Sequence, residues 1–130
     1  MKIVSFSPNL MVKNVNKSID FYCNILGFSL IQTVPESGTA DWGMLEKNDF
    51  FIMLQKEESI KQEYPELNDQ TFGGALTFYI RISDIHEFYE EINNKINVLH
   101  KMHKTFYGAD EFAITDPDGF ILVFSSTVEM

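Results

Sequence analysis

The sequence predicts an α+β fold built from two βαβββ modules in tandem. The first observation is the order of the segments: a strand, a helix and three strands follow one another, and the same order then begins again. The second observation is a constant offset. Val12 and Ile82 end the first strand of each half, and Phe50 and Phe120 open the last strand, in both cases 70 residues apart. Because a unit of about 55 residues cannot bury both faces of its sheet alone, we expect the two modules to pack on each other.

In the first half, residues 5–12 alternate between apolar and polar side chains and predict a strand with Leu10 and Val12 on one face. Apolar residues then recur at helical spacing, at Val15, Ile19, Tyr22 and Leu26. Asn14 or Asn16 can cap this helix, and Gly27 can end it. Three further strands are expected at residues 28–34, 39–47 and 50–55.

Polar residues 56–72 predict a connector with room for one short helix. In the second half, a strand at 75–82 precedes a helical stripe, with Ser83 or Asp84 as its cap. The stripe consists of Ile85, Phe88, Tyr89, Ile92 and Ile96. Strands are expected at residues 97–102, 109–115 and 120–125. The turn at 116–119 has the Pro and Gly positions of a tight turn.

Composition and charge exclude several classes of function. The 45% hydrophobic and 22% charged residues indicate a globular chain, and no apolar run is long enough to span a bilayer. A net charge of −9 disfavours nucleic acids and anionic membrane surfaces. It can attract a cationic ligand, although the favoured interpretation is that the acidic residues only confer solubility. The N-terminal residues lack the apolar core of a signal peptide, so we expect a cytoplasmic protein. Cys23 is the only cysteine, which excludes an internal disulfide and a thiolate zinc cluster.

The predicted strands have two unlike faces. One face carries aliphatic residues such as Leu54 and Leu122 and is expected to lie under the helices. The other face mixes aromatic, methionine and hydrogen-bonding side chains, which suits a small-molecule pocket, although a partner chain covering the face is the alternative. The candidate ligand-binding residues are Ser7, Asn9, Trp42, Phe51, Met53, Thr77, Tyr79, Arg81, Phe112 and Val123.

Two of these candidates have competing interpretations. Arg81 is the only arginine and points to the mixed face, where it can pair with an acidic ligand group or form an ordinary salt bridge at the rim. Trp42 is the only tryptophan, and the offset makes Phe112 its counterpart in the second module. These two aromatic residues can stack on a flat ligand or pack in the core.

The remaining reactive side chains are expected to have ordinary structural roles. We expect His86, His100 and His103 to lie on the surface rather than to bind a metal ion. Cys23 is expected to pack as a small hydrophobic residue. Asp116 and Asp118 are expected to form the turn rather than an acid–base pair.

Two stretches resemble the vicinal oxygen chelate superfamily, which includes glyoxalase I, extradiol dioxygenases and the fosfomycin and bleomycin resistance proteins. They are 9-NLMVKNVNKSIDFYCNILGF-28 and 113-AITDPDGFILVF-124. The resemblance implies a single glyoxalase/bleomycin-resistance-type domain over residues 1–130, a cupped, open mixed β-barrel with its helices outside. Its module boundaries are about 3–58 and 75–127, with a connector at 59–74.

The enzymes of this superfamily hold one divalent metal ion with a ligand from the first and last strand of each module. The matching positions here are Ser7, Met53, Thr77 and Val123, none of which is a carboxylate or an imidazole. We therefore expect no metal, no cofactor and no catalytic residue at these positions. Whether the chain is an enzyme stays open, and the missing ligands count against it.

The favoured function is metal-independent binding of a small molecule, with sequestration of a cationic or aromatic compound and antibiotic resistance as in the bleomycin resistance proteins. The alternative is a glyoxalase-like lyase or dioxygenase with an unrecognised metal site or a metal-free active site. The expected partners are a small-molecule ligand and a second copy of the chain in a homodimer, with no nucleic acid and no membrane.

Overall fold

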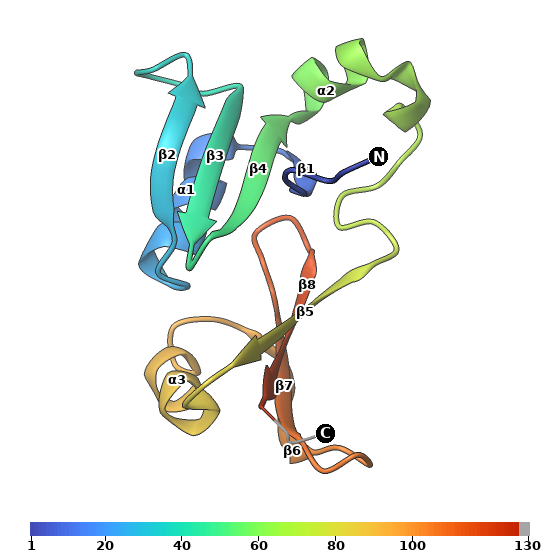
Figure 1. Cartoon of the computed structure of the whole chain (residues 1–130). Coiled ribbons are helices and arrows are strands. Elements are labelled where there is room, and N and C mark those ends of the chain that lie inside the picture. Colours follow the sequence, from blue (N-terminus) through green and yellow to red (C-terminus); the bar gives the residue numbers. More distant parts are fainter. Residues whose placement is uncertain (128–130) are drawn as a thin grey trace. The chain divides into compact units, whose positions relative to one another are not determined.

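The computed structural model describes residues 1–127 and divides the chain into two compact units, Met1–Phe72 and Gly73–Met130. Figure 1 colours the first unit from blue to yellow-green and the second from yellow to red. Each unit contains one run of strand, helix and three strands, so each is described by itself.

The first unit is a four-stranded sheet with one helix of the repeat and a helical extension. The strands are β1 (Asn9–Val12), β2 (Ser29–Val34), β3 (Trp42–Lys47) and β4 (Phe50–Lys56), in the order β1-β4-β3-β2. Helix α1 (Val15–Asn24) connects β1 to β2, and β1 pairs parallel with β4. After β4, the predicted connector forms helix α2 (Glu57–Glu63) and a 3-10 helix, η1 (Pro65–Leu67).

The second unit has the same topology. Its strands are β5 (Thr77–Ile82), β6 (Val98–Lys104), β7 (Asp110–Thr115) and β8 (Ile121–Ser126), in the order β5-β8-β7-β6. Helix α3 (Ile85–Ile92) follows β5, which pairs parallel with β8. The two parallel pairs have the same register, 70 residues apart. Asn9 lies opposite Met53 in the first sheet, and Tyr79 lies opposite Val123 in the second. The predicted α+β fold of two tandem βαβββ modules is confirmed.

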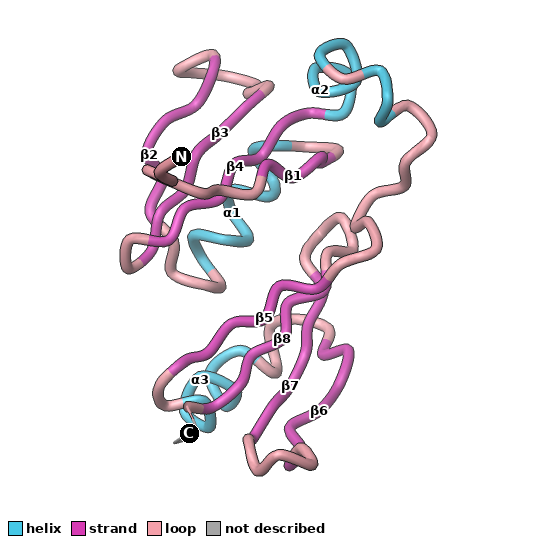
Figure 2. The backbone as a smooth tube through the Cα atoms, turned by 45° about the vertical axis from the view of Figure 1, so that its right-hand side comes forward, coloured by secondary structure: helices cyan, strands magenta, loops and turns pink. Residues whose placement is uncertain are grey.

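Each helix of the repeat covers one face of its own sheet, as Figure 2 shows for α1 and α3. In the first unit, Val15, Ile19 and Tyr22 of α1 are buried together with Leu45 and Leu54 of the sheet. In the second unit, the rings of Phe88 and Tyr89 on α3 contact Phe112, which stacks on Phe124. The opposite face of each sheet therefore carries the mixed residues, as the alternation predicts.

The first helix begins and ends as predicted. The Asn14 side chain accepts a hydrogen bond from the Lys17 N–H at 2.9 Å, and Gly27 takes a left-handed φ of 76° after the last turn. In α3, Asp84 occupies the cap position but has a φ of 54° and makes no side-chain capping bond. Helix α3 also ends at Ile92, so Ile96 lies outside it, because two asparagines, which are poor helix formers, follow.

Strand β1 is shorter than the predicted residues 5–12, because pairing starts only where Pro8 ends. The Pro8 carbonyl accepts a hydrogen bond from the Met53 N–H at 2.9 Å, but Pro8 itself has no N–H to donate. Ser7 therefore lies in the segment that leads into β1, not in the strand.

The counterpart of Trp42 is Glu111, not the predicted Phe112. Trp42 pairs with Gln55, and Ser125, the residue equivalent to Gln55, pairs with Glu111. Four residues separate the pair Glu46 and Phe51 at the β3–β4 turn, whereas five separate the equivalent pair Thr115 and Ile121 at the β7–β8 turn. This difference shifts β7 by one residue, and a shift of one residue moves every side chain to the other face of a sheet.

No helix within residues 1–127 is long and apolar enough to cross a membrane.

Candidate functional site

The open face of the first sheet, on the side away from α1, brings together methionine, aromatic and amide side chains. Asn9 on β1, Met53 on β4 and Met44 on β3 lie in one row across the strands. The neighbouring row contains Gln55 and Trp42. Residues directly opposite one another in neighbouring strands point to the same face, so these five side chains share it. The predicted candidate Phe51 lies on this face as well, opposite Glu46.

A chain of amide hydrogen bonds runs across this face to α2. Asn9 Nδ2 donates to Gln55 Oε1 at 2.8 Å, and Gln55 Nε2 donates to Ser59 Oγ at 2.9 Å. Within residues 1–127, Asn9 Oδ1 is buried and has no hydrogen-bond partner. A buried acceptor without a donor costs about 1–3 kcal/mol, and a ligand donor would offset that cost.

The open face of the second sheet holds a polar cluster that we call the Glu111 cluster: Glu111 on β7, Tyr79 on β5, Ser125 on β8 and Tyr107 in the β6–β7 loop. The Tyr107 hydroxyl donates to Glu111 Oε2. The Tyr79 hydroxyl lies 3.0 Å from Ser125 Oγ and 3.3 Å from Glu111 Oε2. Glu111 and Ser125 are buried, whereas both tyrosines are about half exposed.

Most predicted candidates lie on these two open faces, but two do not. Thr77, Tyr79 and Val123 share the open face of the second sheet, and Arg81 lies opposite Ser125 in the same row as Glu111. Ser7 precedes β1. Phe112 lies on the opposite face, fully buried under α3, so it packs in the core of its unit.

Met44, Gln55, Glu111, Ser125 and Tyr107 lie on or beside these faces but were not among the predicted ligand-binding residues. Alternation places Gln55 and Ser125 on the mixed face. It does not predict their hydrogen bonds to Asn9 and Tyr79, because those depend on the pairing of the strands. Tyr107 lies in a loop, where alternation carries no information about the face. Glu111 was missed because the offset assigned its neighbour Phe112 to the open face.

The four positions that the resemblance marks for a metal ion do not fit one. Met53 and Val123 offer a thioether and an isopropyl group, and Ser7 and Thr77 offer neutral hydroxyls. Elsewhere within residues 1–127, no three His, Cys, Asp or Glu side chains come close enough to hold a metal ion.

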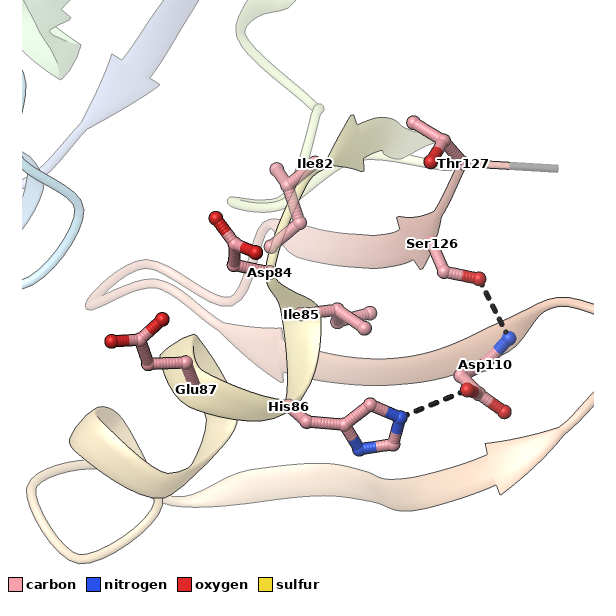
Figure 3. Close-up of a pocket in the computed structure, with 8 residues that line it drawn as sticks. All are labelled: Ile82, Asp84, Ile85, His86, Glu87, Asp110, Ser126 and Thr127. Atoms are coloured by element: carbon pink, nitrogen blue, oxygen red, sulfur yellow. Dashed lines mark hydrogen bonds and ion pairs between the residues drawn. The ribbon is translucent and has the colours of Figure 1, made fainter.

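A surface pocket of about 370 Å³ lies where α3 begins, between the ends of β5 and β8 (Figure 3). His86 Nε2 and Lys104 Nζ each lie 2.9 Å from a carboxylate oxygen of Asp110. A hydrogen bond from Lys104 is the main cause that holds the pKa of the Asp110 carboxyl below its usual value, and a hydrogen bond from His86 adds to it. Asp84 and Glu87 point away from Asp110 in Figure 3, so the carboxylates do not converge on a common ligand.

Two other reactive groups have the structural roles expected of them. Asp116 Oδ1 accepts hydrogen bonds from the backbone N–H groups of Asp118 and Phe120, both at 2.9 Å, which confirms its role in the turn. Burial, followed by the neighbouring charge of Asp20, raises the pKa of the Cys23 thiol. A raised pKa disfavours the thiolate and therefore nucleophilic chemistry at Cys23.

The comparisons with known proteins give one consistent result. Residues 2–124 match the family model described as Glyoxalase/Bleomycin resistance protein/Dioxygenase superfamily. A bleomycin resistance protein from Geobacillus stearothermophilus is 29% identical over 133 aligned residues, covering 94% of this chain and 96% of the relative. A bleomycin resistance protein from Staphylococcus aureus matches with the same identity and coverage.

Solved structures share the fold at lower identity. A glyoxalase/bleomycin resistance protein/dioxygenase from Nocardioides has a TM-score of 0.78 at 17% identity, covering 99% of this chain and 87% of the other. A virulence protein from Salmonella typhimurium has a TM-score of 0.74 at 23% identity, covering 98% of this chain and all of the other. At these identities the likeness establishes the fold alone.

Proposed function

This chain belongs to the Glyoxalase/Bleomycin resistance protein/Dioxygenase superfamily, and from that premise we propose that it binds and sequesters a small organic molecule without a metal ion. The observation that carries the proposal is the unpartnered Asn9 Oδ1, buried in the same row as Met53 and Met44. Binding pockets for small molecules combine a mostly apolar wall with a few fixed polar groups. The open face of the first sheet has both.

The chemistry of this face favours a ligand with an N–H donor and a flat or apolar portion. Asn9 Oδ1 can only accept a hydrogen bond, so it selects a donor. Trp42 and the methionines offer polarisable surface to an aromatic group. The net charge of −9 favours a cation over an anion. A cationic or aromatic compound therefore fits best, and the names of the bleomycin resistance relatives point in the same direction.

Bleomycin is expected to raise the melting temperature of the protein in the presence of EDTA, because a ligand that binds only the folded state stabilises it by mass action. Mn²⁺, Ni²⁺, Fe²⁺ and Zn²⁺ at modest excess are expected to leave it unchanged. Thermal melting with each addition measures both effects. A rise of several degrees with one metal, reversed by chelator, would instead support the alternative of a metal-dependent lyase or dioxygenase.

The variant Asn9→Ala tests whether the amide takes part in binding. We expect bleomycin to bind this variant about tenfold more weakly, which corresponds to the loss of one hydrogen bond of about 1.4 kcal/mol. Asn24→Ala, at an exposed position at the end of α1, is the matched control and should bind as the wild type does. Equal affinity of the folded Asn9→Ala variant and the wild type would remove Asn9 from the site.

We also propose that the protein is a cytoplasmic homodimer. The edge strand β2 exposes Leu30, Ile31 and Val34, each about half accessible, and symmetric pairing is the commonest way to cover such a surface. Sedimentation velocity at tens of micromolar is expected to give a species of about 30 kDa, twice the chain mass of 15.0 kDa. A species with the mass of one chain would contradict the dimer. Cell fractionation tests whether the protein is cytoplasmic.

A further inference from the structure

The Glu111 cluster places a carboxylate with one uncommitted oxygen on the open face of the second sheet. Glu111 is only 9% exposed, and the exposed part includes the carboxylate oxygen Oε1, which is therefore within reach of a ligand. Two phenol hydroxyls, those of Tyr107 and Tyr79, lie within hydrogen-bond distance of Oε2. Within residues 1–127, the other oxygen, Oε1, has no hydrogen-bond partner.

The charge of this carboxylate has no cationic partner within residues 1–127. Arg81 lies in the same row but two strands away, and it forms no salt bridge with Glu111. His103 lies opposite Glu111 in the register, yet its Nδ1 is hydrogen-bonded to the Lys101 carbonyl at 2.8 Å. The carboxylate is partly desolvated by the residues around it, and the two neutral phenols do not balance its charge. The arrangement therefore favours a cation supplied from outside the chain.

The two tyrosines give little stability to the core of their unit. Tyr79 is 50% and Tyr107 is 44% exposed, whereas the aromatic residues under α3 are more deeply buried. Their hydroxyls are directed at the carboxylate, which fixes its orientation, and their rings are available to a ligand beside it. Side chains from two strands and a loop thus position Glu111 on a half-open surface.

We propose that Glu111 anchors the cationic group of a small-molecule ligand on the open face of the second sheet, and that this group is an amidinium, a guanidinium or a primary or secondary ammonium with N–H donors. The inference rests on the proposed binding function and narrows its ligand class. Such a group donates directly to Glu111 Oε1 in a charge-assisted hydrogen bond, which is stronger than one between neutral groups. Tyr79 and Tyr107 are positioning residues, because they act on the ligand through the carboxylate.

The test compares benzamidine with benzamide, two probes of nearly the same shape that differ in charge. NMR titration of the ¹⁵N-labelled full chain measures both affinities and locates the perturbed amides. We expect benzamidine to bind at least about tenfold more tightly than benzamide, with shifts centred on Tyr107, Glu111 and Ser125. The variant Glu111→Gln should remove this difference. Glu91→Gln, which removes the same charge from an exposed position on α3, should keep it.

Three outcomes would overturn the proposal: equal affinity for the two probes, unchanged benzamidine affinity in folded Glu111→Gln, or shifts confined to the first sheet. If Glu111→Gln does not fold, the comparison of the two probes on the wild type still decides. A bleomycin response without a charge preference at Glu111 would leave the proposed function standing and remove this inference. Charge-selective benzamidine binding without a bleomycin response would leave this inference standing and remove the proposed function.

Discussion

Phe112→Ala is expected to lower the free energy of unfolding by about 3–5 kcal/mol, the cost of removing a fully buried aromatic ring. The Phe112 ring stacks on Phe124 with centroids 5.2 Å apart and contacts Tyr89 edge-on at 4.9 Å. The cavity left behind would be bounded by α3 and the sheet, which hold each other in place. Urea denaturation, followed by circular dichroism, measures the change in midpoint and slope.

The control for this variant is Phe50→Ala. Phe50 opens β4 and is 75% exposed, so its removal should change the free energy of unfolding by less than about 1 kcal/mol. The comparison also separates a core role for Phe112 from a ligand-binding role. A Phe112→Ala protein of nearly wild-type stability that binds bleomycin poorly would contradict the core assignment and restore Phe112 to the site.

The placement of Phe112 shows what the sequence could and could not predict about the fold. The order of elements and the parallel pairing of first and last strands follow from the 70-residue offset, because both modules bury the same faces. The face of β7 does not follow from it, because the β7–β8 turn is longer than the β3–β4 turn. A strand pattern has a period of two, so an error of one residue in turn length reverses the face without changing the predicted strand.

The candidate site was predictable only strand by strand. Alternation alone places Asn9, Met53 and Tyr79 on the open faces, since each lies within a regular strand. The hydrogen bonds from Asn9 to Gln55 and from Tyr79 to Ser125 each join residues 46 positions apart. Those contacts depend on the strand register, which the sequence does not state. The hydrogen bond from Tyr107 to Glu111 depends on the conformation of the β6–β7 loop, which alternation does not predict.

Gly73→Ala is expected to destabilise the protein by about 2–5 kcal/mol, through two separate costs. Gly73 has a φ of 86°, a conformation that costs an L-residue about 1–2 kcal/mol. In addition, an alanine Cβ would lie 2.8 Å from the Gly119 carbonyl oxygen, and such overpacking typically adds about 1–3 kcal/mol. The contacted atoms are backbone atoms of the turn that Asp116 holds by its hydrogen bonds, so they cannot simply rotate away.

Gly108→Ala separates the two costs that Gly73→Ala combines. Gly108 has nearly the same φ, 88°, but its Cβ would meet nothing within 4 Å. It therefore isolates the backbone term, and we expect a loss of about 1–2 kcal/mol. Urea denaturation of both variants gives the difference, which measures the contact between Gly73 and the turn that precedes β8. If both variants lose the same stability, the turn yields to the extra methyl group, and the close approach of Gly73 to Gly119 does not constrain the sequence at residue 73.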